Sequence, residues 1–164
     1  MFGRERGFGV LRMASVSILH VWMGFLCLVA VSKLADLAPF QASLATWRVI
    51  PEWSHTIISM AVPLVELACG LAWFLGLARG RVVWMSVIGL GVVTMAYAAQ
   101  VWFAEPPKCD CLGILLRFER WEQGAWAVVE RNVALLIVAG EAAAAWTRVT
   151  TRRTSSSEEQ IEGP

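Results

Sequence analysis

Residues 13–32, MASVSILHVWMGFLCLVAVS, contain no Asp, Glu, Lys or Arg, and this stretch decides the fold class. A helix needs about 20 mostly apolar residues to cross the roughly 30 Å hydrocarbon core of a bilayer. Two further stretches have the same character: residues 82–104 carry no charge, and residues 53–78 carry only Glu66. The composition agrees, since 57% of the 164 residues are hydrophobic and 16% are charged. The sequence therefore predicts an integral membrane protein rather than a soluble domain.

A fourth apolar stretch covers residues 125–146, although Glu130, Arg131 and Glu141 interrupt it. We expect it to be helical as well, because backbone at membrane depth has few alternatives to helical hydrogen bonding. The predicted fold is an all-α bundle of four transmembrane helices. A short amphipathic helix over residues 114–123 is expected to lie along the outer membrane surface.

The chain divides into three parts by composition. Residues 1–12 form a basic lead, residues 13–147 form the membrane domain, and residues 148–164 are rich in Ser, Thr and Glu. The last part is expected to be disordered, because it has too little apolar area to bury. The first apolar stretch is too long for a secretory leader and lacks a small-x-small cleavage site, so we expect it to be retained.

The distribution of charge predicts the orientation in the membrane. Arginines concentrate before the first stretch, between the second and third, and after the fourth: Arg4, Arg6, Arg12, Arg79, Arg81, Arg148, Arg152 and Arg153. The other two connections mix acidic and basic residues. The positive-inside rule then predicts cytoplasmic termini in the inner (cytoplasmic) membrane, with the connection around residues 105–122 outside. The net charge of +1 argues against a nucleic-acid surface.

Cys109 and Cys111 are the strongest candidates for chemistry, because one residue separates two thiols just after an apolar stretch. A disulfide across so small a ring is usually strained and easily reduced. A purely structural bond would remove little chain entropy. Zinc would need two more ligands, and His55 is the one plausible donor in the outer loops. The favoured interpretation is thiol–disulfide exchange, with a metal pair and a static or incidental pair as alternatives.

Glu66 is the clearest signal inside the membrane, because an ionisable group at mid-span is costly unless it is paired or protonated. His20 and Glu141 lie at a similar estimated depth, while Arg131 lies nearer the outer boundary of the fourth stretch, with Asn132 beside it. The favoured interpretation is a structural polar clamp between helices, and the alternative is a proton relay or an acid on the side of a quinone. A haem is not expected, since His20 and His55 lie at different depths.

Two other cysteines, Cys27 and Cys69, lie within the predicted spans. Free cysteine is a common small buried hydrophobe. We expect both to be packing residues, and the alternative is that Cys27 relays electrons from the outer pair.

Several motifs together resemble the MauE branch of the DoxX-like membrane proteins. The segment PLVELACGL at residues 63–71 is similar to that family's Pro-x-x-Glu-x-x-x-Gly pattern. The segment CDCLG at 109–113 and the Arg-Asn pair at 131–132 are similar to its Cys-x-Cys-Phe-Gly and Arg-Asn signatures. The segment KLAD at 33–36 resembles the exit of its first helix. The resemblance covers about residues 13–147, and Leu112 departs from it where the family usually has Phe.

The resemblance implies a four-helix membrane protein connected with methylamine utilisation. In that setting it would support disulfide formation or maturation of the periplasmic methylamine dehydrogenase small subunit. The layout is also similar to that of quinone-coupled disulfide-forming membrane proteins, which makes a quinone the candidate electron acceptor by analogy. No other cofactor is evident, and no metal is expected.

The leading hypothesis is that Cys109 and Cys111 exchange disulfides with a thiol or thioredoxin-like protein outside the membrane, as a thiol–disulfide oxidoreductase would. Glu66, Lys33, Arg131 and Asn132 are the supporting candidates, either holding the bundle together or shaping a site beside the cysteines. Two rival hypotheses remain: a non-catalytic membrane subunit or assembly factor, and a small transporter built around Glu66. The sequence leaves open whether the chain is an enzyme.

Overall fold

A computed structural model describes residues 3–103, 105 and 124–161, and every regular element in these ranges is a helix. The elements are α1 (Gly3–Ala35), α2 (Leu37–Leu44), the 3-10 turn η1 (Glu52–Ser54), α3 (His55–Phe74), α4 (Arg79–Phe103) and α5 (Ala125–Ile161). Helix α1 packs against α3 and α5, and α4 packs against α3 and α5. The prediction of an all-α protein is therefore confirmed for the described residues.

Three of the described helical stretches are long and apolar enough to cross a membrane: Met13–Ala35, Glu52–Phe74 and Arg79–Phe103. These match the three uncharged stretches of the sequence. Helix α5 is not among them, since Glu130, Arg131 and Glu141 interrupt its apolar part. The predicted count of four spans is thus supported for three helices.

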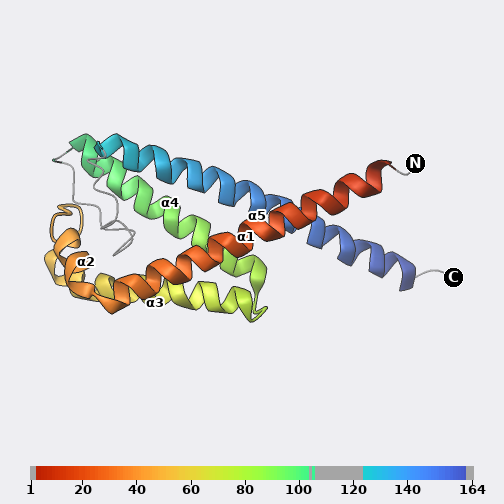
Figure 1. Cartoon of the computed structure of the whole chain (residues 1–164), viewed down its shortest axis with the longest axis horizontal. Coiled ribbons are helices and arrows are strands. Elements are labelled where there is room, and N and C mark those ends of the chain that lie inside the picture. The colour runs from red at the N-terminus through yellow and green to blue at the C-terminus, as the bar shows by residue number, and fades with distance from the viewer. Residues whose placement is uncertain (1–2, 104, 106–123, 162–164) are drawn as a thin grey trace.

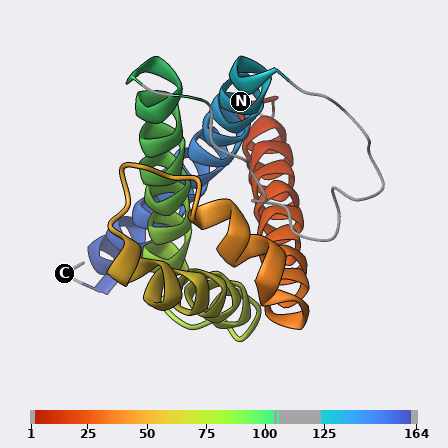
Figure 2. The same cartoon turned by 90° about the vertical axis from the view of Figure 1, so that its left-hand side faces the viewer.

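The two ends of the molecule differ in construction (Figure 1). At one end lie α2, the end of α4 and the start of α5, and we call this the α2 end. At the other side α3 turns into α4, and both α1 and α5 extend beyond that turn. The view along the long axis shows α2 lying across this end of the molecule, among the surrounding helices (Figure 2).

The break between α1 and α2 falls at Asp36, whose backbone is extended at φ −145° and ψ 93°. Pro39 lies in the first turn of the new helix, where a missing N–H breaks no hydrogen bond. In an uninterrupted helix the same proline would leave the carbonyl of Ala35 without its partner. The sequence thereby ends α1 at Ala35 and starts the short helix α2 at Leu37.

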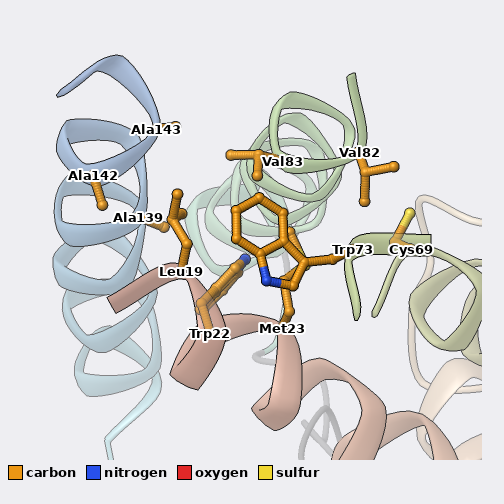
Figure 3. Packing of buried hydrophobic residues seen from close by; sticks show 10 residues of the cluster. All are labelled: Leu19, Trp22, Met23, Cys69, Trp73, Val82, Val83, Ala139, Ala142 and Ala143. Carbon is orange, nitrogen blue, oxygen red and sulfur yellow. The ribbon is translucent and has the colours of Figure 1, made fainter. Parts of the chain in front are cut away.

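The main core lies where α1, α3, α4 and α5 meet (Figure 3). Its centre is the indole of Trp73, 1% exposed, with Leu19 and Met23 of α1 both fully buried. The buried residues that helix α5 contributes to this core are the alanines Ala139, Ala142 and Ala143, and the partly buried Leu135 and Trp146 of α5 pack against it. Small residues let two helix backbones approach closely, so the alanines allow α5 to lie close to the other helices.

Helix α5 continues to Ile161 and so includes residues 148–161, which belong to the part of the chain that was expected to be a disordered tail. A helix that is already nucleated gains one backbone hydrogen bond for each residue added, and needs no apolar burial to continue. The same reason accounts for the helix that starts at Gly3 within the basic lead. The amphipathic helix expected at 114–123 lies outside the described residues.

Candidate functional site

The most prominent polar contact of the described residues joins Lys33 of α1 to Glu66 of α3. The ammonium nitrogen of Lys33 donates to both carboxylate oxygens of Glu66, each at 2.9 Å. The Lys33 side chain is 3% exposed and that of Glu66 is 23% exposed. The same ammonium lies 5.0 Å from the centre of the Phe40 ring of α2. A charge at this depth is tolerated when its partner is close and bonded on both oxygens.

The partner of Glu66 is not among those that depth estimates suggested. His20 instead has its Nδ1 atom 2.7 Å from the carbonyl oxygen of Val16 and its ring against Trp73. Glu141 is exposed on α5. Lys33 directly follows the uncharged stretch of residues 13–32. Because α1 continues to Ala35, the Lys33 side chain lies at the helix interface, where it meets Glu66.

Arg131 and Asn132 stand apart from this ion pair. Asn132 is buried, at 5% exposure, and its Oδ1 accepts a hydrogen bond from an Arg131 guanidinium nitrogen at 3.4 Å. The Nε atom of Arg131 is buried without a hydrogen-bond partner in the described structure. No hydrogen bond or ion pair among the described residues joins either side chain to Lys33 or Glu66. The four supporting residues thus form two pairs rather than one cluster.

Two glutamines that sequence reasoning did not select also link elements at the α2 end. Gln41 of α2 donates from Nε2 to the Ser59 hydroxyl of α3 at 3.2 Å. Gln100 of α4 donates from Nε2 to the carbonyl oxygen of Thr46 at 2.8 Å. Gln100 is 1% exposed. Gln100 could have been identified from the sequence, because it is an amide side chain in an otherwise uncharged, apolar span. Such a group costs free energy unless it is hydrogen-bonded.

The cysteines of the sequence fall into two groups. Cys27 and Cys69 are free thiols, and Cys69 is buried. A methyl group built on Gly70 would overlap the Sγ atom of Cys27, so this thiol fills the notch that the glycine leaves. Such packing agrees with the expected role of Cys27 as a small buried hydrophobe. Cys109 and Cys111 lie outside the described residues.

The described residues contain no group of three or more His, Cys, Asp or Glu side chains that is placed to hold a metal ion. The polar contacts that the structure places are an ion pair, two amide contacts between separate elements and the Arg131–Asn132 contact. They couple α1 to α3, α2 to α3, and α4 to the connection after α2. The arrangement holds this end of the bundle together through directional polar bonds.

The three long apolar helices and the paired charge at membrane depth define the class of this chain as a helical integral membrane protein. A family model described as methylamine utilisation protein MauE matches residues 12–147, and the chain belongs to that family. The resemblance to the MauE family is thereby confirmed, and it connects the chain with methylamine utilisation. No curated protein and no solved structure matches it significantly.

Proposed function

We propose that this chain is a membrane-embedded thiol–disulfide redox protein that supports disulfide formation in, or maturation of, an extracytoplasmic partner protein. The observation that carries the proposal is where the cysteine-bearing connection is attached. Helix α4 ends at Phe103 and α5 begins at Ala125, both at the α2 end (Figure 1). Cys109 and Cys111 belong to the connection between these two points.

The proposed exchange transfers two electrons and two protons. A thiolate of the partner attacks one sulfur of a Cys109–Cys111 disulfide, forms a mixed disulfide and releases the other sulfur as a thiolate. A second partner thiolate then displaces the first cysteine. The partner leaves with a disulfide, and the pair remains as a dithiol. A membrane quinone, reduced to the quinol by two electrons and two protons, is the acceptor that we propose for regenerating the disulfide.

The charges and the topology support the proposed orientation. Arginines cluster at the start of α1, toward the end of α5 and at the α3–α4 turn, and all three regions lie on the side away from α2. The positive-inside rule makes that side cytoplasmic and the α2 end extracytoplasmic. Helix α5 starts at the α2 end and runs back to the side where α1 begins, so we propose that it is the fourth crossing.

The polar contacts at the α2 end support a scaffold role for Lys33 and Glu66. A transporter built around Glu66 would need that carboxylate to be accessible to its cargo, whereas both of its oxygens are bound to Lys33. The rival in which the chain is a non-catalytic subunit or assembly factor keeps the same scaffold and differs only in the role of the cysteines.

Replacing Cys109 and Cys111 by serine, singly and together, separates the redox proposal from that rival. The proposal predicts that oxidation of the partner is lost while the protein still inserts and melts like the wild type. The Cys27→Ser and Cys69→Ser variants are the matched controls, since those thiols lie in the helix bundle. Full partner maturation by the double serine variant would overturn the redox role.

Single variants also test the mechanism directly. In the reverse direction, the thiolate that remains in Cys109→Ser or Cys111→Ser attacks the disulfide of the oxidised partner and releases one partner sulfur as a thiolate. The mixed disulfide is expected to accumulate because the second cysteine of the pair, which would release the reduced partner, is missing. Mass spectrometry of the trapped adduct would identify the partner protein. Absence of any adduct with both single variants would count against the exchange step.

A further inference from the structure

Helix α5 accompanies α4 over nearly the whole length of that helix. Val128, near the start of α5, packs with Tyr97 in the small cluster at the α2 end. Further along α5, the Trp146 ring lies against Gly80 at the start of α4, and its centre is 5.8 Å from that of Trp73. Helix α4 is long and apolar enough to cross a membrane. The stretch of α5 between these two contacts therefore lies at the depth of the α4 span.

The face of α5 that points away from the core has a repeat of its own. Its residues are spaced alternately three and four apart, and we call them the α5 seam: Ala134, Ile137, Glu141 and Ala144. Ile137 is 61% exposed, Ala134 and Glu141 are exposed, and Ala144 is half-buried. Two helices that wrap around each other in a left-handed pair meet along a seam with this spacing. The pattern therefore fits contact with another helix.

Glu141 makes lipid a poor cover for the α5 seam. Among the described residues, none forms a hydrogen bond or an ion pair with its carboxyl group. Its Cα atom lies about 7.5 Å along the helix from that of Trp146, on the side of the bilayer centre. Helical side chains lean toward the N-terminus of their helix, so the carboxyl group extends away from the nearer headgroups. Hydrocarbon offers it no hydrogen-bond partner, which makes exposure to lipid costly.

Glu130 is exposed on the same side of α5 but lies at a different depth. It belongs to the second turn of the helix, which begins at Ala125, and its side chain leans toward that end. Its carboxylate is therefore close to the headgroups at the α2 end, where a charge costs little. Glu141 has no such access, so the part of the seam around Glu141 is where a cover is needed.

We propose that the α5 seam is the contact surface for a second copy of this chain. All copies insert in the same direction, so a two-fold axis along the membrane normal brings the same residue of each seam face to face. A protonated carboxyl group donates one hydrogen bond and accepts another, so two Glu141 side chains that share a proton are complementary. Ala134 and Ala144 are small enough for the helices to approach closely. This inference rests on the membrane crossing proposed for α5, and not on the redox role of the cysteines.

Cysteine cross-linking in membranes locates the contact. Ile137→Cys and Ala144→Cys are made singly in full-length protein whose four native cysteines are replaced by alanine, so redox chemistry of the native thiols does not affect the result. Oxidation with copper phenanthroline is expected to convert both variants into covalent dimers. Val92→Cys of α4 is the matched control, because Val92 is 62% exposed, and it should stay monomeric. Equal dimer yields at Ile137 and Val92, or no dimer at either seam position, would overturn the proposal.

A second measurement tests the role of Glu141. Energy transfer between donor-labelled and acceptor-labelled copies in liposomes follows self-association as the protein-to-lipid ratio rises. Glu141→Leu is expected to raise the ratio at half-association about tenfold, as loss of a strong polar contact between membrane helices would. Glu141→Gln should keep the wild-type ratio, because an amide also donates and accepts hydrogen bonds. Glu130→Leu is the matched control and should leave the ratio unchanged.

Three results would overturn the inference, each for a different reason. If Glu141→Leu associates at the wild-type ratio, the carboxyl group does not hold the copies together. If the protein stays monomeric at every ratio while Ile137→Cys cross-links to a different membrane protein, the seam binds another helix. If protease outside the cell removes a C-terminal tag but not an N-terminal one, α5 does not cross the membrane. The redox role of Cys109 and Cys111 is judged separately, by their double serine variant.

Discussion

The α2 end and the α3–α4 turn of this protein are held together by different means. At the turn, the backbone closes on itself: the Gly76 amide donates to the Trp73 carbonyl at 3.1 Å, and the Leu77 amide donates to the Ala72 carbonyl at 2.8 Å. The Arg79 side chain adds a bond to the Trp73 carbonyl at 3.2 Å. At the α2 end, side chains bridge separate elements. Local backbone bonds make the turn self-sufficient, whereas the α2 end depends on a few distant partners.

The packing shows the same contrast. The core around Trp73 lies toward the turn, and it is built from close contacts between helices, such as that of Cys27 with the glycine notch at Gly70. Toward the α2 end the described buried hydrophobic cluster is small, with Trp47, Tyr97 and Val128. Close packing makes a region rigid, while a region held by single polar bonds responds to the loss of one of them. A site that receives a partner protein is better placed in the second kind of region.

The largest effect is expected from breaking the Lys33–Glu66 pair. Glu66→Ala leaves a charged lysine, 3% exposed, without its partner, and should destabilise the protein by about 3 kcal/mol. Unfolding of the purified protein in detergent measures the change. The paired replacement Lys33→Met with Glu66→Leu should recover most of the loss, because it removes both charges. If Glu66→Ala unfolds like the wild type, the α2 end does not depend on this bond.

A smaller loss of stability is expected from a change in the core around Trp73. Gly70→Ala places a methyl group on the Cys27 Sγ atom and should cost about 2 kcal/mol through overpacking. Adding Cys27→Ala should restore part of the stability, since the nearest remaining atom is then the Met23 carbonyl oxygen at 3.1 Å. The coupling in this double-mutant cycle is the quantity to measure.

Gly89→Ala is the control for the glycine notch, because a methyl group there would meet nothing within 4 Å. It should leave stability unchanged or raise it slightly, as alanine favours helix more than glycine does. If Gly70→Ala and Gly89→Ala lowered the stability equally, the close approach of α1 and α3 would not be the cause of the loss at Gly70.

The smallest effect is expected at the turn itself. Ala78 has φ 43°, in the left-handed region that disfavours residues with a Cβ atom. Ala78→Gly should stabilise the protein by about 1 kcal/mol or less, while Gly76→Ala, at φ 78°, should destabilise it by a similar amount. Thermal melting in the same detergent compares the two. A lower melting temperature for Ala78→Gly would contradict the idea that local backbone geometry governs this end.

Absence of charge predicted the three apolar helices well, because hydrocarbon excludes charged groups regardless of tertiary contacts. The same rule did not pair Lys33 with Glu66, since it treats every charge as a boundary and contains no information on contacts between helices. Glu66 itself was identified from its depth, but its partner depends on how α1 and α3 pack. Gln100 was missed because the burial of one amide and the carbonyl that it binds are set by tertiary structure. Cys109 and Cys111 stay predictions from the sequence.

The Lys33–Glu66 contact also bears on how the chain enters the bilayer. Lys33 is synthesised before Glu66 and lies at the end of α1. Until α3 is inserted, its long side chain can extend to the lipid headgroups. Glu66 lies well inside α3 and has no such escape. Insertion of α3 is therefore most favourable when α1 already lies beside it. The order of synthesis would in this way guide α3 toward its correct neighbour.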